Sequence, residues 1–173
     1  MTEIIWHGRG GQGAFTAARL LGEAYSLKAD SYALAFPSFG PERRGAPIRA
    51  FTKLDKRPVR NRSEITKADH SIFLDDTLFD AKAFFELKPN GTILLNTKQV
   101  YDDPRIITLD GGSIASSILR LPITNTILLG AFAAISDEIT LEEICEAIRH
   151  SMPKRLQEIN ITAVKAAYKE VIE

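Results

Sequence analysis

The chain has 173 residues, of which 45% are hydrophobic and 25% are charged, and its formal net charge at pH 7 is zero. These values exclude a disordered or low-complexity polypeptide and give no general reason to expect nucleic-acid or membrane binding. The single cysteine, Cys145, excludes an intrachain disulfide, a cysteine-rich zinc site and an iron–sulfur cluster held by this chain alone. No segment is typical of a signal peptide or a membrane span, so a cytoplasmic protein is expected.

Short apolar runs alternate with helical patterns along the chain. The expected strands are residues 3–7, 31–36, 48–54, 71–74, 92–96 and 105–109. The expected helices are residues 14–27, a weak one at 79–87, and then 124–136, 141–150 and 156–172. Residues 89–91 predict a turn, and Thr140 with Glu143 fits a capping box. The alternation predicts a single α/β domain over residues 1–173, Rossmann-like, with a mainly parallel sheet and helices on both faces.

Residues 8–13 match the pattern G-x-G-x-x-G between an expected strand and an expected helix. Glycines allow positive φ and close backbone approach, and the following helix presents unpaired N–H groups and a partial positive charge. This glycine-rich turn is therefore predicted to bind phosphate, and the alternative is a tight crossover that binds nothing. The candidate binding residues are Gly8, Arg9, Gly10, Gly11, Gln12 and Gly13.

A nicotinamide dinucleotide would call for a carboxylate near the end of the second strand, to hold the ribose hydroxyls. Here residues 33–37 read Ala-Leu-Ala-Phe-Pro, and Asp30 stands at the wrong end of the strand. A Walker P-loop is excluded because Ala14 and Phe15 occupy the positions of the required Lys and Ser/Thr. A free-standing NAD(P)-binding oxidoreductase thus stays open only as an alternative.

The segment 41–62 is strongly basic, with eight basic and two acidic residues. Just before and within it, residues 36–47 contain three prolines and two glycines around Arg43 and Arg44. This loop follows the second expected strand, which places it at the same sheet edge as the glycine-rich turn. The planar fork of arginine suits phosphate, so Arg43 and Arg44 are predicted anion contacts. The alternatives are salt bridges with a partner surface, or solvated side chains.

The glycine-rich turn and residues 38–47, Ser-Phe-Gly-Pro-Glu-Arg-Arg-Gly-Ala-Pro, together resemble the gamma subunit of the 2-oxoacid:ferredoxin oxidoreductases. The resemblance covers nearly the whole chain and is strongest to the pyruvate type, since the 2-oxoglutarate type tends to carry Met at the position of Arg43. It implies a non-redox subunit that helps to bind coenzyme A for oxidative decarboxylation to acyl-CoA, CO2 and reduced ferredoxin. The second alternative function, after the NAD(P)-binding oxidoreductase, is a purely structural subunit whose basic loop meets an acidic neighbour.

The resemblance also implies that thiamine diphosphate, Mg and the 4Fe–4S clusters lie on alpha, beta and delta-type partner subunits, with ferredoxin reached only indirectly. The isolated chain is expected to be inactive, with no catalytic or metal-ligating residue. Two further positions follow from it. Thr16 is expected either to donate to a phosphate or to bond its own helical turn, and Asn125 either to meet an adenine edge or to cap the next helix.

Other polar residues are given structural roles. His7, His70 and His150 share no ligand spacing, so none of them is expected to be catalytic. Cys145 lies on the apolar face of an expected helix, so its thiol is predicted to be buried in the core. The pair Asp75-Asp76 is expected to cap the helix that follows it.

Overall fold

The computed structural model describes residues 1–38, 40 and 43–173. The motif positions Phe39, Pro41 and Glu42 lie outside the described residues. The strands are β1 (Thr2–Arg9), β2 (Tyr32–Pro37), β3 (Pro47–Asp55), β4 (Ala68–Phe73), β5 (Leu87–Asn96) and β6 (Ile106–Leu109). The helices are α1 (Ala14–Ser26), α2 (Gly111–Ile114), α3 (Asn125–Ile135), α4 (Leu141–Ser151) and α5 (Lys154–Ile172), with the 3-10 helices η1 (Asp76–Leu78) and η2 (Ala81–Glu86) and the π-helix η3 (Ala115–Leu119).

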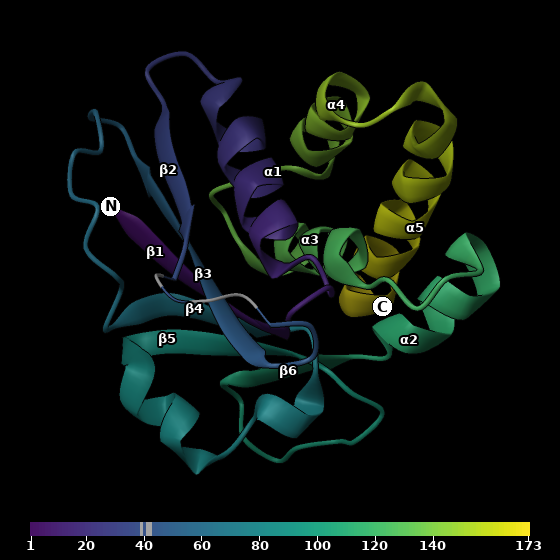
Figure 1. Ribbon diagram of the computed structural model, residues 1–173, viewed down its shortest axis with the longest axis horizontal. Helices are drawn as coiled ribbons and strands as arrows, with labels where there is room; N and C mark the ends of the chain where they lie inside the picture. Colours follow the sequence, from purple (N-terminus) through teal and green to yellow (C-terminus); the bar gives the residue numbers. More distant parts are fainter. Residues whose placement is uncertain (39, 41–42) are drawn as a thin grey trace.

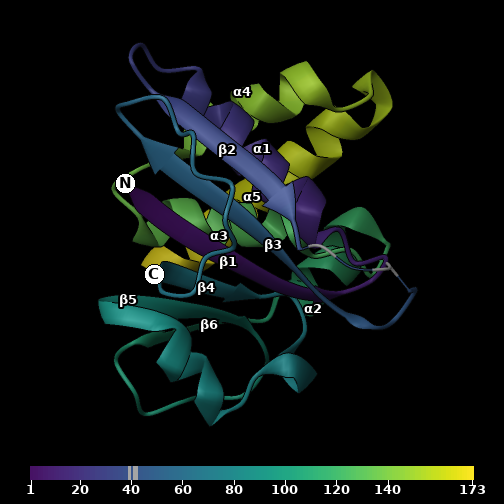
Figure 2. The same cartoon turned by 60° about the vertical axis from the view of Figure 1, so that its left-hand side comes forward.

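One six-stranded sheet organises the molecule, in the order β2-β3-β1-β4-β5-β6 (Figures 1 and 2). The pairs β1–β4, β4–β5 and β5–β6 are parallel, whereas β3 is antiparallel to both of its neighbours. β3 is therefore the one strand of this sheet that is antiparallel to the rest. It follows β2 directly in the chain, and the two strands form a hairpin. The prediction of an α/β fold with a mainly parallel sheet is confirmed.

The long α-helices α1, α3, α4 and α5 gather on one face of this sheet and enclose the main core (Figure 1). Alternate residues of β1 face them, so Ile4 and Trp6 are fully buried there. The Trp6 Nε1 donates to Thr52 Oγ1 at 3.1 Å, and that hydroxyl donates to the Ala18 carbonyl at 2.9 Å, which joins β1, β3 and α1. The predicted core position of Cys145 is confirmed, since its side chain is fully buried.

The opposite face of the sheet is covered more thinly, by the 3-10 helices η1 and η2 and by the irregular segment 56–67. Helices thus lie on both faces, but the connection from β4 to β5 is short and accommodates only 3-10 turns. Segment 56–67 is held down by the buried Lys53, whose Nζ donates to the carbonyls of Asn61 at 3.2 Å and Ser63 at 2.7 Å. Buried Ile65 anchors the same segment from its other end.

Three local features differ from expectation. The weak helix expected at 79–87 is replaced by the 3-10 helix η2. Residues 89–91 do not form a free turn but lie inside β5, where the pairing register shifts between Ala68 and His70. Gly91 is required there, since a Cβ would lie 2.9 Å from the Ala68 carbonyl. The helical stretch α2–η3 is not among the expected helices; its Ile114 and Ala115 are buried in the main core, and Ile118 and Leu119 pack against that core. The capping box of Thr140 and Glu143 is confirmed at the start of α4.

Among the described residues, no helix is both long enough and apolar enough to cross a membrane.

Candidate functional site

The glycine-rich turn connects β1 to α1 with two residues in the left-handed region. Gly11 has φ +95° and Gly13 has φ +82°, which is why glycine is needed at these positions. Gly8 is buried at the end of β1, where a Cβ would lie 3.2 Å from that of Ala14. Gly13 is the N-cap of α1 and has no side chain to bond the first amides of the helix. The start of α1 therefore presents backbone donors and a partial positive charge at the carboxyl end of β1.

The turn is in direct contact with residues 43–46, which lead into β3 and which we call the arginine loop. Gly10 N donates to the Ala46 carbonyl at 2.9 Å, and Gly45 N donates to the Gly10 carbonyl at 3.0 Å. Gly10 and Arg44 form a short parallel bridge. A methyl group at Gly10 would overlap the backbone carbonyl of Arg43. The two motifs picked out in the sequence are thus brought together at one edge of the sheet.

The polar side chains of the turn are engaged with other protein groups. Arg9 Nε and Gln12 Nε2 donate to the same oxygen of Asp75, Oδ2, at 3.1 and 3.0 Å. The remaining guanidinium nitrogens of Arg9 donate to the Gly45 carbonyl at 3.1 Å and to Thr77 Oγ1 at 2.8 Å. These contacts give Arg9 and Gln12 a structural role, and their predicted contact with a ligand stays a prediction.

The side chains of Arg43 and Arg44, in contrast, belong to exposed residues. The ion pairs formed within the described part of the chain include neither of them. Their backbone lies next to Gly10, and both residues are exposed to solvent. The arginine loop can therefore offer two cations beside the amides of the glycine-rich turn.

Asn125 and Thr16 flank the same turn. Asn125 is only 6% exposed, and its Nδ2 donates to the Gly13 carbonyl at 3.4 Å. A Cβ at Gly13 would lie 2.5 Å from that nitrogen, so Asn125 packs tightly under the turn. The N-cap of α3 is Thr124, not Asn125 as the capping alternative supposed. Thr16 is half-buried in the first turn of α1, and its hydroxyl bonds no other described residue.

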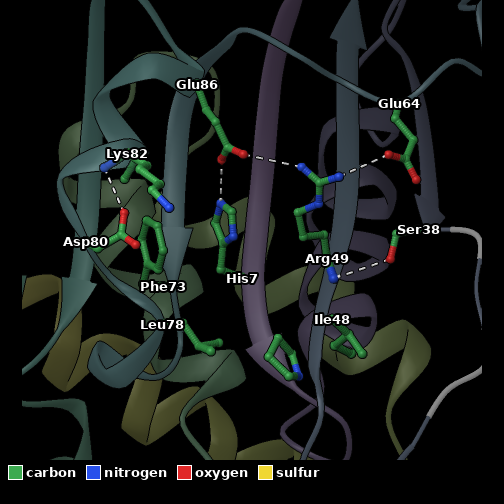
Figure 3. A pocket seen from close by; sticks show the side chains of 12 residues that line it. His7, Ser38, Ile48, Arg49, Glu64, Phe73, Leu78, Asp80, Lys82 and Glu86 are labelled. Carbon is green, nitrogen blue, oxygen red and sulfur yellow. Dashed lines mark hydrogen bonds and ion pairs between the residues drawn. The ribbon is translucent and has the colours of Figure 1, made fainter.

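A separate pocket of about 560 Å³ lies on the thinly covered face of the sheet (Figure 3). His7 stacks on Phe73 with ring centroids 4.2 Å apart, and its Nε2 lies 3.3 Å from Glu86 Oε2. Glu86 also pairs with Arg49 at 3.3 Å, and Arg49 pairs with Glu64 at 3.1 Å. The hydrogen bond from His7, opposed by burial and aided by the charges of His7 and Arg49, holds the pKa of Glu86 below its usual value.

His7, Glu86, Arg49 and Glu64 pair with one another in this pocket and do not form a catalytic relay. Ser71 Oγ lies 3.0 Å from the same Nε2 of His7 that meets Glu86, whereas a nucleophilic triad uses both ring nitrogens. Sequence reasoning passed over Arg49 and Glu86. The signal exists only in the register, which places His7 directly opposite Arg49 across β1 and β3. Among the described residues, no three His, Cys, Asp or Glu side chains are grouped to hold a metal ion.

The family model of pyruvate ferredoxin/flavodoxin oxidoreductase matches residues 3–170 of the chain. The gamma subunit common to the pyruvate and ketoisovalerate oxidoreductases of Pyrococcus furiosus is 41% identical, over 98% of this chain and 97% of that protein. The pyruvate synthase subunit PorC of Methanothermobacter thermautotrophicus is 40% identical, over 99% of this chain and 96% of that protein.

Among solved structures, the pyruvate oxidoreductase subunit PORC of Thermotoga maritima is similar with a TM-score of 0.83 at 31% identity. The match covers 97% of this chain and 95% of that one. Sequence and fold therefore agree over almost the full length, and the resemblance seen in the two motifs is confirmed. The chain belongs to the pyruvate ferredoxin/flavodoxin oxidoreductase family and corresponds to its gamma subunit.

Proposed function

We propose that this chain is the non-redox gamma subunit of a 2-oxoacid:ferredoxin oxidoreductase of the pyruvate type, and that it helps to bind coenzyme A. The complex would convert a 2-oxo acid and coenzyme A to acyl-CoA and CO2, with the electrons passing to ferredoxin. Thiamine diphosphate, Mg and the 4Fe–4S clusters would lie on alpha, beta and delta-type partners. Cys145, the one cysteine here, is fully buried and offers no ligand set for a cluster.

The observation that carries this proposal is the backbone pairing of Gly10 with residues 44–46. It brings the turn that leads into the uncapped start of α1 against the backbone of the exposed residues Arg43 and Arg44. Coenzyme A carries a pyrophosphate and a 3′-phosphate, which suit backbone amides at a helix N-terminus and bidentate guanidinium groups. Such a ligand needs no ribose-binding carboxylate, and β2 contains none.

Within this site the residues fall into two groups. The amides of the turn and the guanidinium groups of Arg43 and Arg44 would bind the phosphates, and Thr16 can donate its hydroxyl to one of them. Arg9, Gln12 and Asn125 are held by protein contacts and would act chiefly by fixing the turn. No group here performs covalent chemistry, so the chain's share in the reaction is to position the acyl acceptor.

The choice of 2-oxo acid would belong to the partner subunits. The relative from Pyrococcus furiosus is described as common to the pyruvate and ketoisovalerate oxidoreductases. A subunit shared between two enzymes with different 2-oxo acids does not by itself select either acid. It can supply the element that both reactions have in common, which is the acceptor coenzyme A.

The test is the double substitution Arg43→Ala with Arg44→Ala in the assembled enzyme. We expect the KM for coenzyme A to rise by about 10-fold or more, with the KM for the 2-oxo acid unchanged, because two charge-assisted contacts are lost. Arg60→Ala with Arg62→Ala is the matched control, since it removes the same charge from exposed positions of segment 56–67. It should leave both constants unchanged.

Two results would contradict the proposal. One is that the Arg43→Ala, Arg44→Ala variant assembles less well with its partners, while the complex that does assemble keeps the wild-type KM for coenzyme A. The loop would then be a structural interface. If calorimetric titration finds tight binding of NADH and none of coenzyme A, the chain is a nicotinamide-binding domain.

A further inference from the structure

Asp75 occupies an unusual position at the end of β4. It was expected to cap the following helix, and its Oδ1 does accept from Thr77 N at 3.0 Å at the start of η1. The other oxygen, Oδ2, points away from η1 toward the glycine-rich turn. It accepts from Arg9 Nε at 3.1 Å and from Gln12 Nε2 at 3.0 Å. Capping uses one oxygen only, so the second has a separate role.

The bonds of Oδ2 extend to the arginine loop through Arg9. The guanidinium group of Arg9 donates to the Gly45 carbonyl at 3.1 Å as well as to Asp75. The backbone N of Arg9 donates to Gln12 Oε1 at 2.7 Å. We call this set of four residues, Asp75, Arg9, Gln12 and Gly45, the Asp75 tether. It joins β4, the glycine-rich turn and the arginine loop, three segments that are far apart in the sequence.

We propose that Asp75 is a positioning residue that fixes the glycine-rich turn and the arginine loop in the arrangement needed to bind the phosphates of coenzyme A. The inference rests on the function proposed above. As an anion, Asp75 would repel a phosphate and so does not itself contact the ligand. It acts through Arg9 and Gln12, whose orientations it determines.

The charge state of Asp75 agrees with this role. Burial works to raise its pKa, but the hydrogen bonds from Thr77 and Gln12 and the charge of Arg9 hold the pKa below the ordinary value. The side chain is 16% exposed, and that of Arg9 is 34% exposed. Asp75 is therefore ionised at neutral pH and accepts from every donor that faces it.

Asp75→Asn separates the tether from the cap. Asparagine caps helices about as well as aspartate, so the bond to Thr77 N can be kept. The second terminal atom becomes an NH2 group, which then faces the donors of Arg9 and Gln12. Adding Gln12→Glu reverses one of these contacts and returns the negative charge beside Arg9. Asp76→Asn is the control, because Asp76 accepts from Thr97 Oγ1 at 2.7 Å and does not contact the turn.

Two measurements follow. In the assembled enzyme, Asp75→Asn should raise the KM for coenzyme A by roughly 10-fold, with the KM for the 2-oxo acid unchanged. In the full-length chain, trypsin should cleave after Arg43 and Arg44 faster in this variant than in the wild type. The added Gln12→Glu should reverse part of both effects, and Asp76→Asn should show neither.

The outcomes distinguish the two proposals. If Asp75→Asn changes neither measurement while Arg43→Ala with Arg44→Ala still raises the KM for coenzyme A, the positioning role is wrong and the binding site stands. A second outcome is that Asp75→Asn accelerates tryptic cleavage, while neither Asp75→Asn nor Arg43→Ala with Arg44→Ala changes the KM for coenzyme A. In that case the tether orders the loop, but the binding site lies elsewhere. That second result would overturn both the positioning role in coenzyme A binding and the proposed function.

Discussion

The glycine-rich turn and the arginine loop lie side by side, yet they use their residues in opposite ways. In the turn, the side chains of Arg9 and Gln12 bond to Asp75, so the backbone amides are the groups that the turn can offer to a ligand. In the loop, the backbone of residues 44–46 pairs with Gly10, which leaves the side chains exposed. Substitutions in the turn should therefore damage the fold first, whereas substitutions of the loop arginines should damage binding alone.

The largest expected effect is that of Gly10→Ala. The new methyl group would overlap the Arg43 carbonyl, and backbone cannot move aside as a flexible side chain can. We expect the free energy of unfolding to fall by roughly 3 kcal/mol, measured by denaturant titration of the chain. Gly40→Ala is the matched control, since a Cβ there meets nothing within 4 Å. Equal stability of the two variants would show that turn and loop are not packed together as described.

The next effect is that of Arg43→Lys with Arg44→Lys, which keeps both charges but removes the planar fork. We expect the KM for coenzyme A in the assembled enzyme to rise about 3-fold to 10-fold, less than for the alanine pair, because lysine cannot bind a phosphate bidentately. The unfolding free energy should change by less than about 0.5 kcal/mol, since both residues are exposed. Loss of stability without a change in KM would reverse the assignment of roles.

A smaller effect should appear at acid pH. Because the pKa of Asp75 in the folded chain lies below its ordinary value, its stabilising contribution is present above about pH 4 and is lost as the pH falls through the lowered pKa. The difference in unfolding free energy between wild type and Asp75→Asn should be about 1 kcal/mol at pH 6. It should shrink progressively as the pH falls below about 4 and through the lowered pKa of Asp75. A difference that is independent of pH would mean that the charge of Asp75 does not hold the turn.

The smallest effect is that of salt. Salt should screen the attraction between the exposed arginines and the phosphates of coenzyme A, but it should affect the uncharged amides of the turn little. Raising the salt concentration from 0.05 to 0.3 M should therefore increase the KM for coenzyme A only about 3-fold. This dependence should be weaker in the Arg43→Ala, Arg44→Ala variant. An equal salt dependence in both proteins would place the ionic contacts of the ligand elsewhere.

Much of this architecture follows from local sequence signals. The alternation of apolar runs predicted most strands and helices, and the spacing of glycines predicted the turn, because both depend on neighbouring residues. The Asp75 tether could not be predicted, since Gln12 and Asp75 are 63 positions apart and meet only through the parallel pairing of β1 with β4. The network of His7, Arg49 and Glu86 depends in the same way on strand register. A lone histidine in a strand carries no sign of the partners that the register provides.

The most direct test is an experimental structure of the assembled enzyme with coenzyme A bound. The account predicts phosphate oxygens within hydrogen-bond distance of the amides of residues 11–14 and of the guanidinium groups of Arg43 and Arg44. Coenzyme A whose phosphates lie away from these groups, for example over Arg49 in the pocket beside His7, would contradict it.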